Sequence, residues 1–431
     1  MRAPFRLVRP VLALALLVGA AVVSAGCVAQ ERPTLVVLGP WTGSEAKPFE
    51  KMLVEMGKQK GRNYVYEGTR SLRETLVAQL RTESPPDVAI LNGPGELAQY
   101  ARDGDAQPLP PDVAGRAIEP WAPRITVPDK HGNTEEKAYW APVRVDLKSV
   151  VWSRPGEKEA GAEDARWCLG MASGATSGWP GTDWIEDLLL QREGPDVYER
   201  WASGALKWND DRVKRAWQDW GAVLATDVEN ARLSITRPFE SPGGGKSGLL
   251  NVGDCTREHQ GAFVRRHYGP DVMPAPTSDF VQGLPAGQNV FEVSGDMAAV
   301  FKPSDAAWEL VLELTSRDAQ AEWGKAAKAG EQPFFPTGTG GAKGATPASR
   351  EVLRMLNGAE RICLDASDAM PSTLRGAFQR AVLEFLENPR DEAVLDGLLN
   401  QLEAERRLQE GAGAFVLDDL CDVPPGRASA G

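Results

Sequence analysis

Residues 34–57, TLVVLGPWTGSEAKPFEKMLVEMG, decide the fold of this chain. The segment opens with an apolar, β-branched run over 34–39, and Ser44 behind it can cap a helix whose apolar residues recur every three or four positions. The same order then repeats, with a strand at 64–66, a helix over 72–80 and a strand at 87–91. This alternation at βαβ spacing predicts an α/β protein with a parallel sheet and helices on its faces.

The composition is that of a globular protein with an unusual number of tryptophans. Of 431 residues, 42% are hydrophobic, and 48 Lys and Arg stand against 60 Asp and Glu, a net charge of −12. This balance excludes a disordered chain and a multi-span membrane protein, and the acidity argues against nucleic acid as a partner. There are 13 Trp and only 3 His, so rigid aromatic surface is abundant and material for a His-rich metal site is scarce.

The N-terminus has the layout of a secretory signal. Three arginines in the first nine residues precede an uncharged run over 11–25, which is shorter than the roughly 18 residues expected of a spanning helix. We therefore expect residues 1–26 to be a signal peptide. Its removal takes away three positive charges, so the exported part carries 45 − 60 = −15.

Residues 24–27, SAGC, resemble a bacterial lipoprotein box, in which Cys27 would become the lipid-bearing N-terminus. Ser24 stands where Leu is usual. The alternative is ordinary cleavage after residue 25, which would leave Cys27 as a spare thiol. On the first interpretation, residues 27–33 are a linker to a lipid anchor on the outer face of the cell membrane.

The other four cysteines predict two disulfides. An even number of cysteines in an exported chain is typical of structural bridges, and Cys168, Cys255, Cys363 and Cys421 allow three pairings that the sequence does not separate. They form no CxxC pair, so a zinc site is not expected. We predict no metal and no cofactor.

Beyond residue 105 the pattern changes to a Pro-rich connection and then to a second lobe. Strand-like runs at 141–146 and 150–152 form the crossing, and Thr182 or Asp183 can cap a helix, as can Asp210. Residues 234–248 read as a flexible loop, 290–293 as a strand, 304–328 and 347–408 as helices, and the tail after 411 as poorly ordered. The chain thus leaves a first α/β unit, forms a second and then returns to both. This order predicts that a ligand binds between the two units.

Motifs for nucleotide binding and hydrolysis are missing. Residues 245–247, GKS, end like a P-loop, but Glu240 stands where that loop needs Gly, and no GxSxG elbow occurs. Sixty acids offer too many pairs for glycosidase carboxylates to be recognised, so a secreted carbohydrate-active enzyme stays as an alternative.

Side chains after the carboxyl ends of parallel strands should face a ligand. Trp41 and Glu45 follow the first strand, and Asn92 follows the strand at 87–91. An indole face, a carboxylate and an amide together suit a sugar ring, which has C–H faces and a hydroxyl rim. The alternative places Trp41 in the core and Glu45 in a first helical turn, where it would offset the helix dipole.

These residues belong to blocks that resemble the extracellular solute-binding lipoproteins of carbohydrate ABC transporters, closest to their α-glucoside-binding branch. The matching blocks are LGPWTGSE at 38–45 with Phe49, VRVDLKSVVW at 143–152, WCLG at 167–170, SGATSGWPGTDWIED at 173–187, Cys255 with Gln260 and Phe263, Gly295-Asp296, and SDAMP at 367–371. The block at 173–187 is the most specific. Residues 234–254 and 337–345 keep little of the family pattern, which bears on the identity of the ligand.

The resemblance implies a two-lobed, periplasmic-binding-protein-like (type II) fold with a ligand cleft between the lobes. Lobe 1 would comprise 34–142 and 289–336, lobe 2 would comprise 143–288 and 337–410, and 411–431 would be a C-terminal tail. It implies no catalysis and a monomer that delivers a sugar to permease subunits. A sensor that signals to another partner is a further alternative.

Seven residues are the candidate ligand contacts. They are Trp41, Glu45, Asn92, Trp179, Asp183, Gln260 and Asp296. Trp179 lies between Gly178 and Pro180, a loop context that favours stacking over a core role, whereas Asp183 could equally be a helix cap. We expect Trp201, Trp208, Trp217 and Trp220, which lie in or beside helical stretches, to pack in the core.

Overall fold

The computed structural model describes residues 34–128, 132, 134–156, 166–240, 248–252, 255–337 and 345–425. The predicted signal segment 1–26, Cys27 and residues 241–247 of the predicted loop 234–248 lie outside the described residues. Among the described residues, no helix is long and apolar enough to cross a membrane.

Thirteen strands are present in the described part of the chain. They are β1 (Thr34–Gly39), β2 (Asn63–Gly68), β3 (Val88–Leu91), β4 (Ile125–Pro128), β5 (Thr134–Lys137), β6 (Trp140–Leu147), β7 (Val150–Ser153), β8 (Trp167–Cys168), β9 (Arg257–Gln260), β10 (Met273–Ala275), β11 (Val290–Val300), β12 (Arg361–Leu364) and β13 (Cys421–Asp422).

The helices occupy most of the remaining described chain. The α-helices are α1 (Lys47–Lys60), α2 (Leu72–Arg81), α3 (Pro94–Asp103), α4 (Pro111–Ala114), α5 (Trp179–Glu193), α6 (Pro195–Ala202), α7 (Asp211–Leu224), α8 (Val228–Ser234), α9 (Leu249–Val252), α10 (Asp305–Leu314), α11 (Arg317–Ala326), α12 (Pro347–Gly358), α13 (Ala366–Ala369), α14 (Ser372–Glu387) and α15 (Glu392–Gly411). Three short 3₁₀ helices are η1 (Gly174–Thr176), η2 (Ala262–His267) and η3 (Thr277–Asp279).

The larger sheet begins with the predicted βαβ units. β1 pairs in parallel with β2 and with β3, which confirms the parallel arrangement expected from residues 34–91. The strand order is β13-β12-β11-β3-β1-β2, and β6 also pairs with β11. β11 is antiparallel to β3 and β6, because the chain returns to this sheet from the opposite direction. The sheet is therefore mixed.

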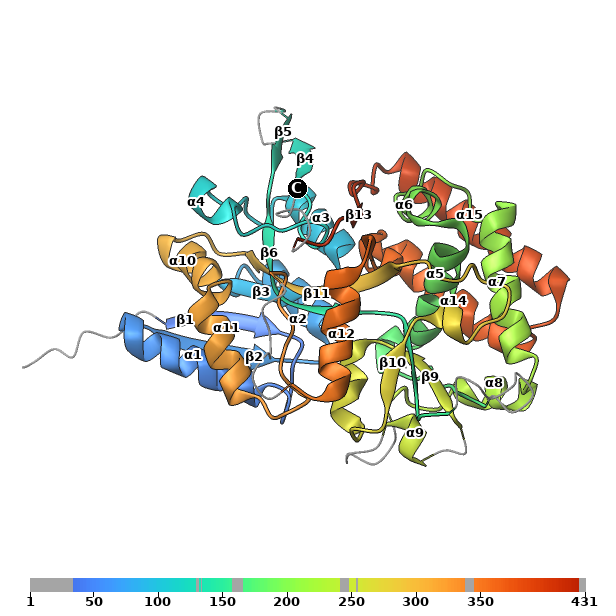
Figure 1. Ribbon diagram of the computed structural model, residues 1–431. Helices are drawn as coiled ribbons and strands as arrows, with labels where there is room; N and C mark the ends of the chain where they lie inside the picture. Colours follow the sequence, from blue (N-terminus) through green and yellow to red (C-terminus); the bar gives the residue numbers. More distant parts are fainter. Residues whose placement is uncertain are drawn as a thin grey trace, which may run out of the picture.

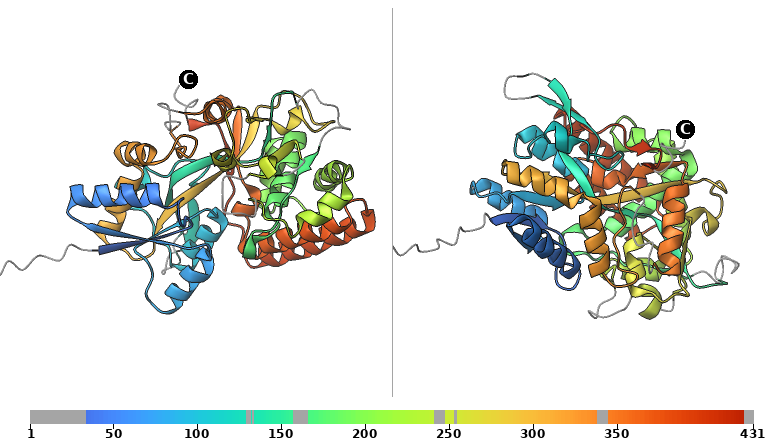
Figure 2. Two further views of the ribbon diagram at one scale, coloured as in Figure 1. Left: turned by 90° about the horizontal axis from the view of Figure 1, so that it is seen from below. Right: turned by 60° about the vertical axis from the view of Figure 1, so that its left-hand side comes forward.

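The predicted strand at 290–293 is the first part of a longer strand, β11. Its first four residues pair in parallel with β12, and its last four pair antiparallel with β3. β11 thus spans the larger sheet from β12 to β3, and α5 packs against it. Two regions of the molecule can be distinguished around it. We call these regions the first half (β1–β3 with α1, α10 and α11) and the second half (β7–β10 with α5, α7, α14 and α15), and they lie side by side in Figures 1 and 2.

A second sheet, with strand order β10-β7-β9-β8, lies in the second half. β7 pairs antiparallel with β9 and β10, and β8 pairs in parallel with β9. All four strands come from the range 150–275, inside the sequence expected to form lobe 2. The detailed boundaries of the two lobes stay a prediction.

The core of the second half is rich in tryptophan, as predicted. Trp201, Trp208, Trp217 and Trp220 are fully buried. Phe378 of α14 meets Trp208 edge-to-face at 4.8 Å, and Phe385 of the same helix meets Trp217 at 5.1 Å. These four indoles therefore stabilise the packing of the helices around α14.

Helix α5 begins earlier than the sequence suggested. It starts at Trp179, with Pro180 in its first turn, so Thr182 and Asp183 lie inside the helix and do not cap it. Gly178 precedes it at φ 103°, and a Cβ on this residue would lie 2.4 Å from the carbonyl oxygen of Gln379. Only glycine fits this close approach, which places the helix start. Asp210, in contrast, caps α7 as predicted.

The C-terminal region also differs from the prediction. Residues 361–364, expected within a helical stretch, form β12, and residues 421–422 of the expected tail form β13, which pairs with β12. One disulfide joins Cys363 to Cys421 across this pair, and the other joins Cys168 to Cys255. The structure thus selects one of the three pairings that the sequence left open.

Candidate ligand-binding site

Three of the candidate residues surround one arginine. β6 and β11 pair so that Arg144 lies directly opposite Asp296, and Arg144 Nε donates to Asp296 Oδ2 at 2.7 Å. The guanidinium carbon also lies 4.8 Å from the ring centre of Trp41, and Nη1 lies 3.9 Å from Glu45 Oε1. The register of two strands therefore builds a group of an indole, two carboxylates and a guanidinium.

The two carboxylates of this group keep Arg144 ionised. Burial lowers the pKa of Arg144, but the carboxylates of Asp296 and Glu45 outweigh it and raise that pKa above its usual range. Burial raises the pKa of Asp296, and Arg144 offsets part of the rise. The guanidinium thus stays a fixed hydrogen-bond donor.

Trp41 is enclosed in this conformation. The residue is 2% exposed, and its ring lies 4.8 Å from Phe49 and 5.1 Å from Trp323. Arg144 covers a further part of the ring. The packing matches the core alternative for this residue, and a ligand contact at Trp41 stays a prediction.

Trp179 is placed differently. It begins α5, it is only partly buried, and its ring meets Phe239 edge-to-face at 4.9 Å and Phe263 at 6.0 Å. Both phenylalanines are also partly exposed. We call Trp179, Phe239 and Phe263 the aromatic cluster. Such a cluster offers apolar faces against which the C–H face of a ring can pack.

Lys148 connects this cluster to buried acids. Its ammonium lies 5.1 Å from the ring centre of Trp179, 3.1 Å from Asp183 Oδ1 and also bonded to Asp365. Burial raises the pKa of Asp183 to about 8, and Lys148 opposes the rise. For Asp365, the attraction of Lys148 outweighs burial and lowers the pKa. Asp183, expected either to contact ligand or to cap a helix, is 1% exposed and bonds Lys148.

Arg266 of η2 contacts both the group around Arg144 and the aromatic cluster. It donates to Glu45 Oε1 at 3.4 Å, pairs with Glu240, and its guanidinium carbon lies 5.8 Å from the ring of Phe263. Glu45 precedes α1 in the first half, whereas η2 follows β9 in the second half. The ion pair of Arg266 with Glu45 therefore spans the two halves.

Asn92 and Gln260 are set apart from these groups. Asn92 is exposed at the end of β3, next to Gly93, where a Cβ would lie 2.8 Å from a guanidinium nitrogen of Arg375. Gln260 is buried in β9, and its Oε1 accepts the main-chain N–H of Gly261 at 3.0 Å. The side chain of Gln260 is thus used locally, and ligand contacts by both residues stay predictions.

Two surface pockets lie away from the candidate residues. One is lined by residues of α7, α14 and α15, including Phe385, and the other lies between α1 and α11 near Met52. Neither contains a candidate residue. In the described part of the chain, the one set of carboxylates close enough to share an ion is Glu186, Glu292 and Asp365, which lies deep in the protein behind Lys148.

The sequence did not single out the cations of the site. Arg144 and Lys148 stand in the block 143–152, where two positive charges interrupt an otherwise mostly apolar crossing segment, and that contrast could have marked them. Arg266, Glu240 and Phe239 carried no such signal, because their position depends on tertiary contacts.

A junction of two α/β halves, lined by aromatic rings and by ion pairs that span it, is the architecture of a protein that binds small solutes. The sequence confirms this class: the chain belongs to the bacterial extracellular solute-binding proteins, whose family model matches residues 62–321. It is a binding protein, so the alternative of a secreted enzyme is set aside. The family also supports the predicted export.

Two relatives cover most of the chain. The alpha-glucosides-binding periplasmic protein AglE of Rhizobium meliloti is 26% identical over 390 residues, which span 82% of this chain and 83% of the relative. The osmoprotective compounds-binding protein GgtB of Synechocystis is 26% identical over 409 residues, which span 83% of this chain and 89% of the relative.

Solved structures confirm the predicted fold class. A chitin oligosaccharide binding protein superposes with a TM-score of 0.64 at 14% identity, over 88% of this chain and 100% of that one. At this identity the likeness shows the fold alone. The fold is the two-lobed, periplasmic-binding-protein-like one that the sequence blocks implied.

Proposed function

We propose that this protein captures a carbohydrate, an α-glucoside or a short oligosaccharide, and delivers it to the permease of an ABC importer. The observation that carries the proposal is the partly exposed aromatic cluster of Trp179, Phe239 and Phe263, set beside charged hydrogen-bonding groups. The relative that binds alpha-glucosides supports a carbohydrate ligand.

The charges of the site favour an uncharged ligand. Three arginines, Arg70, Arg144 and Arg266, contact three carboxylates, Glu45, Glu240 and Asp296. Their formal charges sum to 3 − 3 = 0. Ion-paired groups keep free N–H donors and carboxylate lone pairs, which suit the hydroxyls of a neutral polyol.

Closure of the two halves would complete the site. Glu45 and Arg266 come from different halves and meet at 3.4 Å, so a ligand that contacts either group binds where the halves approach. A sugar would bind with one ring face on the aromatic cluster and its hydroxyls on the charged groups. The permease would then recognise the closed form.

The test is titration of the mature protein with neutral di- and oligosaccharides, charged sugars, amino acids and compatible solutes. Calorimetry and tryptophan fluorescence would follow binding. We expect a neutral α-linked sugar to bind at micromolar concentration. Tighter binding of a solute from another class, with all sugars weaker than about millimolar, would contradict the proposal.

We also propose that Cys27 carries the lipid anchor and that the receptor acts as a monomer. In a producing bacterium, labelled fatty acid should enter the wild-type protein and the Ser24→Leu variant but not the Cys27→Ala variant. Entry of the label into Cys27→Ala, or no entry into the wild type, would contradict the anchor. Chromatography with light scattering should give the mass of one chain.

A further inference from the structure

Three carboxyl groups meet in the interior where α5, β11 and α13 approach one another. Glu186 of α5 and Glu292 of β11 are 0% exposed, and Asp365, which caps α13, is 1% exposed. One oxygen of each lies within 4.8 Å of the others. Three ionised carboxylates this close and this deep would repel one another strongly, so something must reduce their charge.

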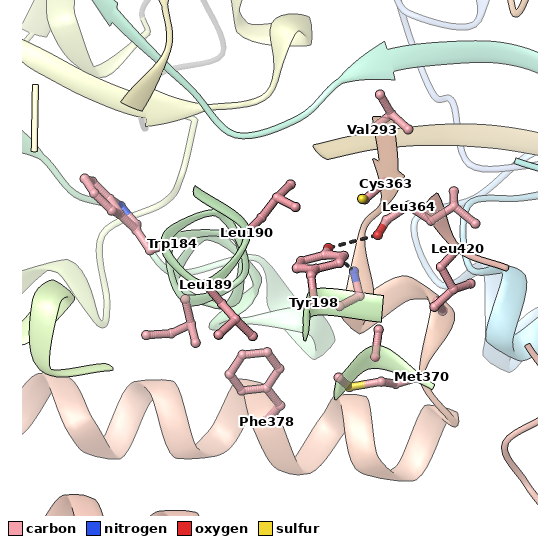
Figure 3. Close-up of a cluster of buried hydrophobic side chains, with 14 of the residues drawn as sticks. Trp184, Leu189, Leu190, Tyr198, Val293, Cys363, Leu364, Met370, Phe378 and Leu420 are labelled. Carbon is pink, nitrogen blue, oxygen red and sulfur yellow. Dashed lines mark hydrogen bonds between the residues drawn. The ribbon is translucent and has the colours of Figure 1, made fainter. Parts of the chain in front are cut away.

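Donors already occupy Glu292 and Asp365. Glu292 Oε1 accepts the hydroxyl of Tyr198 at 3.1 Å and Oε2 accepts that of Ser149. Asp365 Oδ1 accepts the hydroxyl of Ser367 at 2.8 Å, and Oδ2 accepts the ammonium of Lys148. The Tyr198 hydroxyl also lies within hydrogen-bond distance of the main-chain carbonyl oxygen of Leu364, to which it can donate (Figure 3). Each of the four carboxyl oxygens therefore already has a hydrogen-bond donor. Burial raises the pKa of Glu292 well above its usual value, whereas Lys148 outweighs burial at Asp365 and lowers that pKa.

Glu186 differs from both. Its Oε2 accepts the main-chain N–H of Ser367 at 3.2 Å. Its Oε1 is buried and has no hydrogen-bond partner among the described residues, although Glu292 and Asp365 lie beside it. An ionised carboxylate oxygen without a donor is costly at this depth, whereas a protonated one could donate to a neighbouring carboxylate.

The charges around Glu186 lead to the same conclusion. From α5, β11 and the residue that caps α13 it is faced by Asp183, Glu292 and Asp365, and Tyr198 of α6 contacts Glu292. One cation pairs with these acids: Lys148, which bonds Asp183 and Asp365. Four acids, with Glu186 included, against one cation leave a surplus of three. Protonation of one carboxyl group reduces this surplus of negative charge and needs no room for an added ion.

We propose that Glu186 holds a structural proton on Oε1 and donates it to the carboxylate of Glu292, which links α5 to β11 at the junction of the two halves. A divalent cation is the weaker occupant, because hydrogen-bond donors and the Lys148 ammonium already take the four oxygens of Glu292 and Asp365. Burial, with the nearby carboxylates, raises the pKa of Glu186 well above its usual value.

The proton makes stability depend on pH in a defined direction. The folded protein keeps this proton above pH 4.5, the ordinary value for Glu, whereas the unfolded chain releases it. Stability from this contact is therefore full at low pH and is lost as pH rises through the folded pKa. One extra bound proton changes the unfolding equilibrium constant about tenfold per pH unit.

The test compares Glu186→Gln with Glu292→Gln. Glutamine at 186 mimics the protonated acid, so Glu186→Gln should match the wild type near about pH 5 and become more stable than it by about tenfold per pH unit above that. Glutamine at 292 would place its NH2 group against the donor of either Tyr198 or Ser149, so Glu292→Gln should raise the unfolding constant roughly tenfold or more at every pH. Urea unfolding across pH measures both.

A second measurement detects the protonated carboxyl group itself. Infrared difference spectra of protein with ¹³C-labelled glutamate should show a protonated carboxyl band at neutral pH that loses part of its intensity in Glu186→Gln, the remainder coming from Glu258, whose pKa burial raises to about 8. Equal pH profiles for wild type and Glu186→Gln, or equal band intensity in the two, would overturn the proposal. So would one equivalent of calcium or magnesium, found by metal analysis, whose removal by EDTA lowers the melting temperature.

Discussion

At the scale of single residues, Trp179 and Trp41 show how one side-chain type serves two purposes. Trp41 follows β1 and is enclosed by Phe49, Trp323 and Arg144. Trp179 begins α5 and keeps a partly exposed ring beside Phe239 and Phe263. The partly exposed ring is the better candidate for stacking, because a ligand need not displace packed neighbours to reach it.

Replacement of Trp179 should therefore weaken ligand binding. We expect Trp179→Ala to bind the sugar about tenfold more weakly, which corresponds to the loss of one stacked aromatic contact of about 1.5 kcal/mol. Calorimetric titration measures the change. The control is Trp308→Ala in α10, which removes another partly buried indole that packs against the core of the first half. Equal losses for both variants would contradict a specific role of Trp179.

The candidate site could be predicted from the sequence only in part. Trp41, Glu45 and Asp296 do lie together, but they meet through Arg144, which became visible only once β6 and β11 were in register. Sequence spacing does not give the register of strands that lie 152 residues apart at this contact. A candidate list built on strand ends therefore finds the acids and misses the arginine that holds them.

At the scale of elements, local patterns predicted the N-terminal βαβ units well, whereas β12 was missed. β12 is four residues long and lies between helices α12 and α13. Its neighbours in the sheet are β11 and β13, which come from distant parts of the sequence. Short strands stabilised by distant partners carry little local signal, because an apolar run of this length also suits a helix.

The disulfide Cys363–Cys421 should hold β13 on the sheet. The bridge closes a loop with a sequence separation of 58, and chain entropy predicts a loss of about 4 kcal/mol in unfolding free energy for the Cys363→Ala/Cys421→Ala double variant. Urea unfolding measures the loss. Hydrogen exchange should accelerate at residues 421–422, because β13 has only two paired residues.

The other bridge provides the matched control for β13. Cys168→Ala/Cys255→Ala opens a bridge with a separation of 87 and should cost a similar free energy, while exchange at β13 stays slow. Fast exchange of β13 in both double variants would mean that general destabilisation, and not the loss of its own bridge, frees this strand.

At the scale of the whole molecule, contacts between the halves occur at more than one place. Arg266 and Glu45 meet on one side of the junction. Gly95 at the start of α3, which follows β3 of the first half, approaches α13, which precedes α14 of the second half, so closely that a Cβ would lie 2.4 Å from the carbonyl oxygen of Ala369. β11 of the larger sheet also packs against α5 of the second half. The two halves are therefore in contact both through a side-chain ion pair and through a close approach of the main chain.

Removal of the polar contact should shift the molecule towards an open form. We expect ligand-free Arg266→Ala to show a larger radius of gyration by small-angle X-ray scattering than the wild type, because Glu45 loses its partner in the second half. High salt should move the wild type in the same direction, since partly exposed ion pairs are screened. The control is Lys325→Ala, which breaks an exposed pair with Glu322 inside α11. An unchanged radius for Arg266→Ala would contradict a role in closure.

The pairing of Cys363 with Cys421 has a consequence for biosynthesis. A ribosome makes residue 421 after residue 363, at a sequence separation of 58, so during synthesis and export Cys363 stays a thiol until Cys421 has followed it. A chain cut short before residue 421 would keep that thiol unpaired and would leave the edge of β12 uncovered. The thiol is thus a chemical mark that distinguishes an incomplete receptor from a finished one.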